Sequence, residues 1–488
     1  MIVANHPTIH VSETQDKITC AHVTAETARL LADLLQANVR FAHWKGNTHL
    51  QASLSGKTDI DILVHPADRL LYEMIVRKRS YKKLNTQPWN AYPALEDWLG
   101  FDYDTGALLH LHTHYDLVNG ITYGRYLQLP WLDQFFAHLQ PDKQTGWPIP
   151  TPELETIVLL VRLQANNLYK KPGIPGGKQN ELITLLSQVQ TNVFRGLCRE
   201  LQMNVPESFD SDIDRILKDR NVQAMLHLSS FFYHQVSDCV KSKWRLATVK
   251  TFYYKHFLKK ARYISQFTGP LQLKKTITGG GKIIAFVGSD GSGKSTICNE
   301  LVKWLTFKID THYFYFGKRP NIKSYDHSLF SRTGFLFNNT FVSRYFRKLA
   351  AGCYYLLLIS KKISMLRLAK GLSKKSSLVI CDRFPQQNVK GFFDGPKLQS
   401  GNGGWLSNIE KKQFNRFCRA GADIVFRLNI SPEVAASRKT DHDHKMIEKK
   451  CIHLSRLTFG NATVIDVDAA MPLEQVLLNI KRNIWENI

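Results

Sequence analysis

The chain has 488 residues, 43% of them hydrophobic, and a formal net charge of +24. This length suffices for two or three domains, and the longest apolar stretch, around residues 350–359, is too short to span a bilayer as a helix. Eight scattered cysteines without a C-x-x-C pair, together with an opening segment that does not resemble a secretory leader, predict a reduced, cytoplasmic protein without a zinc site.

Positive charge is concentrated in the later part of the chain. Residues 1–150 hold 13 basic and 15 acidic side chains, whereas residues 303–375 hold 15 basic and two acidic ones. A basic segment of this kind attracts polyanions, so nucleic acid and an acidic membrane surface are candidate partners. A solvated basic surface beside a phosphate-binding site explains the same charge, and we favour that interpretation over docking.

Three regions are predicted along the chain. Residues 1–145 mix helical and strand patterns, residues 151–277 are almost entirely helical in pattern, and Thr278–Gly281 forms a flexible joint before the region 281–488. In this last region short apolar strands alternate with helices, which is typical of an α/β fold with a parallel, doubly wound sheet. The expected strands are Lys282–Val287, His312–Phe316, Ser377–Cys381, Ile424–Asn429 and Thr463–Asp466, and the expected closing helix is Pro472–Trp485.

A glycine-rich sequence opens the third region. Residues 283–296 read IIAFVGSDGSGKST, a buried strand followed directly by the phosphate-loop pattern G-x-x-x-x-G-K-[ST] and a helix. The glycines let backbone amides wrap around a polyphosphate, Lys294 supplies charge for the β- and γ-phosphates, and the Ser295 hydroxyl can bind Mg²⁺. The expected nucleotide-binding residues are Gly288, Ser289, Gly291, Ser292, Gly293, Lys294, Ser295 and Thr296.

Two further segments fit phosphoryl transfer. The strand LVICDRF ends in Asp382 and Arg383, where side chains at the carboxyl end of a parallel strand face the ligand crevice. Asp382 can hold Mg²⁺ and Arg383 can clamp a phosphoryl group. Farther along, a short helix capped by Ser431 leads into a basic run that we interpret as a lid over the triphosphate. The basic side chains of this run are Arg438, Lys439, Lys445, Lys449 and Lys450. A solvent-exposed Asp-Arg pair and a solvated helix face are the alternatives to these two interpretations.

These motifs, GSDGSGKST, DRF and LNISPEVAASRK followed by a basic lid, resemble the thymidylate kinase family of nucleoside monophosphate kinases over residues 281–488. The resemblance implies transfer of the ATP γ-phosphoryl group to a small acceptor, dTMP by default, with Mg²⁺ as cofactor. It implies Ser295 and Asp382 as Mg²⁺ ligands, and a possible homodimer. The catalytic residues that it implies are Asp290, Lys294, Arg383 and Arg438.

The acceptor side departs from the family pattern. Phe316–Pro320 reads FGKRP where the family has an R-E-P-G-G-type segment, and 385–387 reads PQQ where a base-reading helix is expected. Arg319 is the candidate clamp for an acceptor phosphate. Two alternatives therefore stay open: a sugar or polyol kinase joined to a nucleotidyltransferase that makes an activated glycosyl donor, and an ATP-binding regulatory or assembly protein docking on a membrane or nucleic acid.

Residues 39–64 carry a second resemblance. They read VRFAHWKGNTHLQASLSGKTDIDILV, with Asp59 and Asp61 at alternate positions and so on one face of a strand. Over residues 25–120 this resembles the nucleotidyltransferase superfamily of the DNA polymerase β type, and it implies an α+β domain in which both carboxylates hold metal for phosphoryl chemistry. Asn47 replaces the usual glycine or serine.

Histidines stand where that superfamily has a third acidic residue. The segment ALLHLHTHY presents His110, His112 and His114 on one face of a strand. Because Mg²⁺ prefers oxygen ligands, these imidazoles indicate altered metal use, substrate contact or lost catalysis. A Zn²⁺ or Mn²⁺ site is a further alternative, as are plain hydrogen-bonded histidines.

Overall fold

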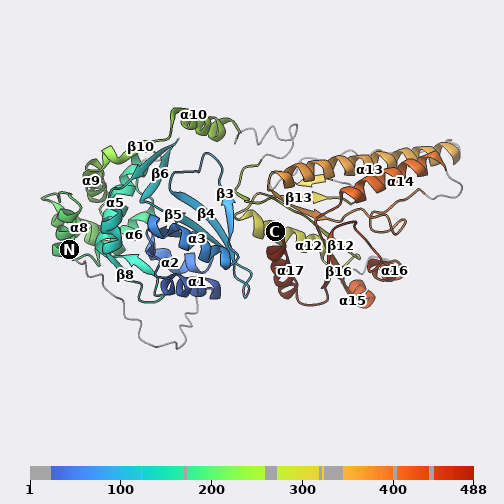
Figure 1. The fold of residues 1–488 in the computed structure, drawn as a ribbon, viewed down its shortest axis with the longest axis horizontal. Helices are drawn as coiled ribbons and strands as arrows, with labels where there is room; N and C mark the ends of the chain where they lie inside the picture. Colours follow the sequence, from blue (N-terminus) through green and yellow to red (C-terminus); the bar gives the residue numbers. More distant parts are fainter. Residues whose placement is uncertain are drawn as a thin grey trace.

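A computed structural model describes residues 23–122, 124–169, 173–258, 272–317, 321–323, 344–398, 404–438 and 444–488. The predicted Arg319 and Lys439 lie outside these residues. Two bodies, each built on a six-stranded sheet, lie side by side, one from the earlier and one from the later part of the chain (Figure 1). None of the helices in the described part is long and apolar enough to cross a membrane.

The first sheet is mixed and has the order β1-β2-β5-β4-β3-β11. Its strands are β1 (Phe41–His43), β2 (Ile60–Val64), β5 (Leu108–His114), β4 (Leu95–Phe101), β3 (Lys82–Asn85) and β11 (Thr276–Ile277). Strands β2 and β5 run parallel, with Asp61 opposite His112, and the other pairs are antiparallel. This register sets the polar residues of β2 and β5 against one another.

Helices cover this sheet with an apolar core. They are α1 (Ala25–Gln36), α2 (Leu50–Leu54) and α3 (Arg69–Lys78), with η1 (Asn47–His49) before α2 and η2 (Pro66–Asp68) before α3. Thr24 caps α1 by accepting a hydrogen bond from the Thr27 amide, and the helix buries Leu30 and Leu34 toward the sheet. The smaller strands and helix nearby are β6 (Val118–Thr122), β7 (Arg125–Gln128), α4 (Leu132–Ala137), β8 (Leu139–Pro141) and β9 (Pro148–Pro150).

The helical region packs directly on the first body. It contains α5 (Pro152–Tyr169), α6 (Gly176–Leu186), α7 (Thr191–Glu200), α8 (Phe209–Asp219), α9 (Val222–His234), η3 (Ser237–Cys239), β10 (Val240–Ser242), α10 (Arg245–Tyr253) and η4 (Tyr254–Leu258). Its buried side chains share one core with Trp44 and Leu63 of the first region. Strands β10 and β11 also pair with β7 and β3. The predicted boundary between 1–145 and 151–277 is thus crossed by a continuous core and by sheet pairing.

The second sheet has the order β14-β13-β15-β12-β16-β17 and is parallel except for the edge strand β14. Its strands are β12 (Ile283–Gly288), β13 (Thr311–Tyr315), β14 (Asn321–Lys323), β15 (Leu378–Asp382), β16 (Ile424–Asn429) and β17 (Thr463–Asp468). Apolar side chains of α12 (Lys294–Thr306) and α17 (Leu473–Asn487) cover one face, and those of α13 (Arg344–Lys374) and α14 (Trp405–Ala420) cover the other. The predicted parallel sheet between two helical layers is confirmed.

The two bodies meet through aromatic packing and hydrogen bonds. The Phe101 ring of β4 stacks on Trp485 of α17 with centroids 5.6 Å apart, and it forms a T-shaped pair with Trp304 with centroids 6.0 Å apart. Arg482 Nη2 donates to the Tyr103 carbonyl at 2.6 Å. The two sheets therefore share buried apolar area.

The predicted joint at Thr278–Gly281 is short and is hydrogen-bonded to the rest of the structure at both ends. The Thr278 hydroxyl donates to Asn85 Oδ1 at 3.0 Å, and the Gly281 amide donates to the Ser373 carbonyl at 3.1 Å. A Cβ at Gly281 would lie 1.9 Å from the Ser377 carbonyl oxygen, so only glycine fits there. The joint fixes β12 next to the first body, contrary to the flexible link that we expected.

Candidate functional site

The phosphate loop connects β12 to α12. Gly291 and Gly293 have φ angles of +85° and +81°, which glycine adopts without strain. A Cβ at Gly291 would lie 2.6 Å from the Ala435 carbonyl, and one at Gly288 would lie 2.5 Å from Ser292 Oγ. These contacts explain the glycine spacing, because the backbone must curl over the N-terminus of α12 without side chains in the way.

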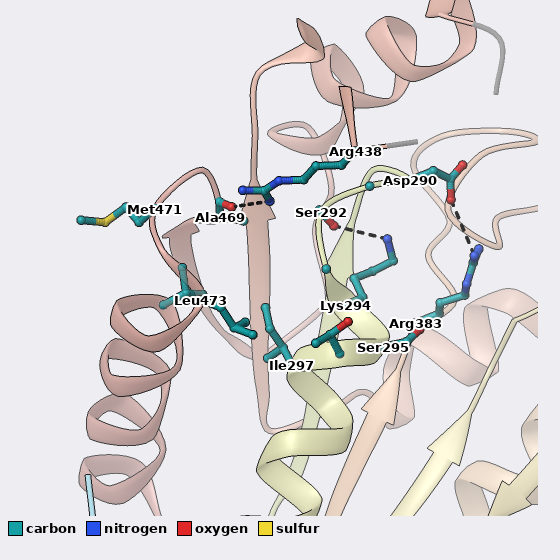
Figure 2. Close-up of a pocket in the computed structure, with 14 residues that line it drawn as sticks. Asp290, Ser292, Lys294, Ser295, Ile297, Arg383, Arg438, Ala469, Met471 and Leu473 are labelled. Atoms are coloured by element: carbon teal, nitrogen blue, oxygen red, sulfur yellow. Dashed lines mark hydrogen bonds and ion pairs between the residues drawn. The ribbon is translucent and has the colours of Figure 1, made fainter. Parts of the chain in front are cut away.

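A cavity of about 480 Å³ lies against this loop (Figure 2). At one end, polar side chains of the loop and of the end of β15 line it, including Asp290, Lys294 and Arg383. At the other end, it is lined by the apolar side chains of Met471, Leu473 and Val476, which follow β17. The volume and the pairing of a charged end with an apolar end suit a small ligand that has a phosphate tail and a flat or apolar head.

Lys294 fills the centre of the loop. Its ammonium donates to the Ser289 carbonyl at 2.5 Å and to Ser292 Oγ at 3.3 Å, and the residue is 8% exposed. Burial, together with the nearby Arg383 charge, lowers the pKa of Lys294 to about 8. Among the described residues this ammonium has only neutral hydrogen-bond partners, so anionic oxygens entering the loop would be stronger ones.

Ser295 and Asp382 meet beside the loop. Ser295 Oγ donates to Asp382 Oδ2 at 2.6 Å, and the Tyr313 hydroxyl donates to the same oxygen at 2.8 Å. Asp382 Oδ1 is buried and has no hydrogen-bond partner within the described residues. An unsatisfied carboxylate oxygen next to a hydroxyl is a donor set that Mg²⁺ prefers, so these residues fit that ion.

Asp290 and Arg383 face each other on the side of the loop nearest the end of β15. Arg383 Nη2 lies 3.7 Å from Asp290 Oδ1, and Lys450 of α16 (His444–Leu454) pairs with the other carboxylate oxygen. Burial alone would raise the pKa of Asp290, but the hydrogen bond and charge of Lys450 outweigh it and hold this pKa below its usual value. Arg383 also approaches Asp394 at 3.8 Å, and buried Lys362 donates to Asp394 at 3.1 Å.

Arg438 occupies a different position from the one we expected. It follows α15 (Pro432–Ser437), and its guanidinium donates to the Ala469 carbonyl at 2.9 Å and the Ala470 carbonyl at 3.4 Å. Figure 2 shows it across the loop from Asp290 and Arg383, toward the apolar end of the cavity. Because α15 is only six residues long, Arg438 lies beside the turn after β17. Among the described residues of the basic run, Lys450 is the one that pairs with Asp290.

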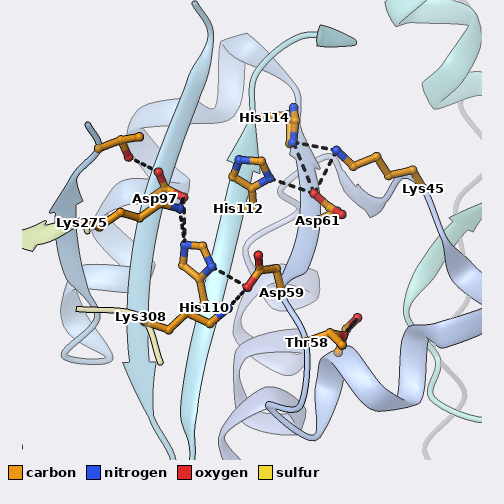
Figure 3. Close-up of polar contacts among 12 residues, drawn as sticks. Lys45, Thr58, Asp59, Asp61, Asp97, His110, His112, His114, Lys275 and Lys308 are labelled. Atoms are coloured by element: carbon orange, nitrogen blue, oxygen red, sulfur yellow. Dashed lines mark hydrogen bonds and ion pairs between the residues drawn. The ribbon is translucent and has the colours of Figure 1, made fainter. Parts of the chain in front are cut away.

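The first sheet carries a second polar cluster (Figure 3). Asp59 and Asp61 lie on one face, as predicted, and the three histidines of β5 lie against them. His110 Nδ1 is 2.7 Å from Asp59 Oδ1, and His112 Nδ1 is 2.9 Å from Asp61 Oδ1. The parallel register of β2 with β5 produces these pairs.

Asp97 of β4 belongs to this cluster and was missed in the sequence. It is 1% exposed, and its Oδ1 lies 2.8 Å from His110 Nε2 and 2.6 Å from Lys275 Nζ. The β4 segment LEDWLGF alternates poorly, so nothing in its pattern indicates that Asp97 faces β5. Only the antiparallel pairing of β4 with β5, with Asp97 opposite His112, brings it there.

Lysines neutralise both predicted metal carboxylates. Lys308, two residues beyond α12, pairs with Asp59, and Lys45 Nζ lies 3.0 Å from Asp61 Oδ1. Burial alone would raise the pKa of Asp59, but His110 and Lys308 together hold it well below its usual value. Asp59 and Asp61 therefore do not form an open carboxylate pair. Within the described residues, the group close enough to surround one ion is Asp61 with His112 and His114.

Fold and loop geometry together define a P-loop region, and its sequence relatives support a nucleoside kinase-like one. No family model matches the chain. It is 29% identical over 216 residues, 40% of this chain and 89% of the relative, to the uncharacterized ATP-binding protein YghS of Escherichia coli K12. It is 25% identical over 213 residues, 42% of this chain and 90% of the relative, to a thymidylate kinase of Plasmodium falciparum.

A solved structure of deoxyadenosine kinase from M. mycoides with bound dATP matches 42% of this chain and 98% of its own, at 20% identity and a TM-score of 0.24. The sequence relatives agree with a kinase-like P-loop region. The nucleotidyltransferase-like architecture expected for residues 1–145 stays a prediction.

Proposed function

We propose that the chain is an ATP-dependent phosphotransferase of the nucleoside kinase type, with the reaction centred on the cavity at the phosphate loop. The observation that carries the proposal is that buried Lys294 and Ser295 line the same cavity, and that the Ser295 hydroxyl donates to Asp382 behind it. Among the described residues, Asp382 Oδ1 has no hydrogen-bond partner. The named sequence relatives, an ATP-binding protein and a thymidylate kinase, support the same donor.

The Lys294 ammonium now donates to the Ser289 carbonyl and to the Ser292 hydroxyl. Phosphate oxygens of ATP would replace these two groups as its hydrogen-bond acceptors. Loop amides at the N-terminus of α12 would complete the anion site. Met471 and Leu473 offer the apolar end of the cavity to the base, and Arg438, held by the carbonyls after β17, lies where its guanidinium could stack on a flat ring. Arg438 is thus proposed as a base contact.

Ser295 and Asp382 would hold Mg²⁺, which when bound neutralises charge on the β- and γ-phosphates. Arg383, at the end of β15, would bind the transferring phosphoryl group through its fork of N–H donors. Asp290 would accept a hydrogen bond from the acceptor, and its contacts with Lys450 and Arg383 keep it ionised for that purpose.

The experiment is an assay of ADP formation and of phosphorylated product with purified chain, ATP and Mg²⁺. Acceptors would be tested in two sets: nucleosides and nucleoside monophosphates including dTMP, then sugars and polyols. We expect a phosphorylated product with the first set of acceptors. Lys294→Met should abolish this product, and Lys303→Met on the same helix should retain it. ATP hydrolysis without any phosphorylated acceptor would instead favour a regulatory ATP-binding protein.

A further inference from the structure

We propose that Asp61, His112 and His114 form a binding site for a first-row transition-metal dication such as Zn²⁺ on the first sheet, separate from the phosphate loop. The inference rests on the convergence of two imidazoles and one carboxylate in the structure, and it does not depend on the proposed kinase function. It replaces the set of three histidines considered from the sequence, because His110 is held between Asp59 and Asp97.

The ligand atoms are already close to the spacing that a metal needs. His112 Nδ1 is 2.9 Å and His114 Nε2 is 3.6 Å from Asp61 Oδ1, and the three ligand atoms all lie within 4.8 Å of one another. Ligands about 2.1 Å from a tetrahedral ion are separated by roughly 3.4 Å. Side-chain adjustments of about an ångström therefore suffice, and the β2–β5 register can remain as it is.

A cation already lies at this point. Lys45 Nζ is 3.0 Å from Asp61 Oδ1 and 3.4 Å from His114 Nε2 (Figure 3). Because an ammonium only donates, both atoms direct lone pairs toward it, and His114 Nε2 is then the unprotonated nitrogen that a metal requires. The other nitrogen, Nδ1, is buried without a hydrogen-bond partner within the described residues. Lys45 therefore marks the metal position and competes for it.

The donor set decides the class of ion. Two imidazoles with one carboxylate suit Zn²⁺ and similar ions, whereas Mg²⁺ prefers oxygen ligands only. His114 is 1% exposed, but the side chains of Asp61 and His112 are 25% and 27% exposed, so an ion can enter from solvent. Three protein ligands leave a coordination position for water or a substrate atom, as in catalytic rather than structural zinc sites.

The test is calorimetric titration of Zn²⁺ into chelator-stripped, nucleotide-free full chain, with Mg²⁺ as the comparison ion. One Zn²⁺ per chain is expected, unaffected by equimolar Mg²⁺. Asp61→Asn and His112→Ala should weaken binding by at least the roughly 10–100-fold that follows loss of outer-shell partners. Lys45→Met should tighten Zn²⁺ binding. Because unfolding would weaken binding, a tighter affinity in this variant cannot be an effect of lost structure. His138→Ala, which removes a histidine paired with Glu200 elsewhere, should change nothing.

Binding must also survive Asp382→Asn, since that variant removes the metal ligand proposed at the phosphate loop. If Asp61→Asn does not fold, His112→Ala and Lys45→Met still give opposite expected shifts. The proposal is overturned if the wild-type chain takes up no stoichiometric Zn²⁺, because Lys45 is then the resident cation. It is equally overturned if Zn²⁺ binds but neither His112→Ala nor Lys45→Met alters its affinity.

Discussion

Replacing Lys294 with methionine should weaken ATP binding and at the same time stabilise the nucleotide-free protein. The side chain is 8% exposed, and within the described part of the chain its ammonium has only a carbonyl and a hydroxyl as hydrogen-bond partners. Methionine has a similar length and fills the same space, so no cavity is left. The two effects have opposite signs because the charge is costly without ATP and useful with it.

The size of each effect follows from the structure. A charge-assisted hydrogen bond contributes about 1.5–3 kcal/mol, so the Kd for ATP should rise roughly 10- to 150-fold. The fall of the Lys294 pKa from 10.5 to about 8 corresponds, at 1.36 kcal/mol per pKa unit, to a cost of about 3 kcal/mol for the charged form in the folded state. Lys294→Met removes this cost.

The stability difference also has a defined pH dependence. Folded chain releases the Lys294 proton near pH 8 and unfolded chain near 10.5, so the unfolded state binds more protons between these values. Wild-type stability should therefore rise through that window relative to Lys294→Met. The advantage of the variant is greatest below pH 8 and vanishes near pH 10.5.

Thermal unfolding with and without ATP, at pH 7 and pH 9.5, measures both effects. The matched control is Lys303→Met, which removes an exposed lysine from the same helix. A lower unfolding temperature for nucleotide-free Lys294→Met, together with unchanged ATP affinity, would refute the reasoning.

Three other changes have definite outcomes. Asp382→Asn should abolish the Mg²⁺-dependent gain in ATP affinity while leaving Mg²⁺-free binding almost unchanged, and equal losses in both titrations would count against the assignment. Lys450→Met should let the pKa of Asp290 rise, because the Lys450 charge lowers it in the wild-type protein. The variant should therefore be less stable than wild type at neutral pH, and this difference should disappear in thermal melts as the solution is acidified through the Asp290 pKa. A stability difference that persists in acid would contradict the pairing. Trp485→Ala should lower the free energy of unfolding by about 3–5 kcal/mol. Because Trp485 stacks on Phe101 of the other body, the whole chain should still unfold in a single denaturant transition, shifted to lower denaturant concentration. Two separate transitions would contradict the shared core.

The phosphate loop could be predicted because its structure is encoded locally. A buried strand, glycines at positive φ and a following helix occupy consecutive residues, and each constrains the next. The parallel order of the strands followed from the same alternation of strands and helices. Asp382 and Arg383 could be identified because Asp382 ends β15 and Arg383 follows it, at the edge where the parallel strand β12 also ends.

Positions set by long-range packing could not be read from the pattern. Arg438 and Lys450 belong to one basic run, and only the placement of α15 and α16 decides which of them meets Asp290. Asp97 reaches His110 through strand pairing that its own segment does not signal. The union of the helical region with the first body depends on α5, whose residues are apolar around most of the helix and so need partners on several sides.

The most direct test of the central claim is a ³¹P NMR measurement of the full chain with ATP, Mg²⁺ and each acceptor in turn. We expect the ATP γ-phosphate signal to be replaced by that of a phosphorylated nucleoside or nucleotide, with one ADP formed for each product molecule. Lys294→Met should give neither. Inorganic phosphate as the sole new signal with every acceptor, or ATP turnover that survives Lys294→Met, would contradict phosphoryl transfer at this loop.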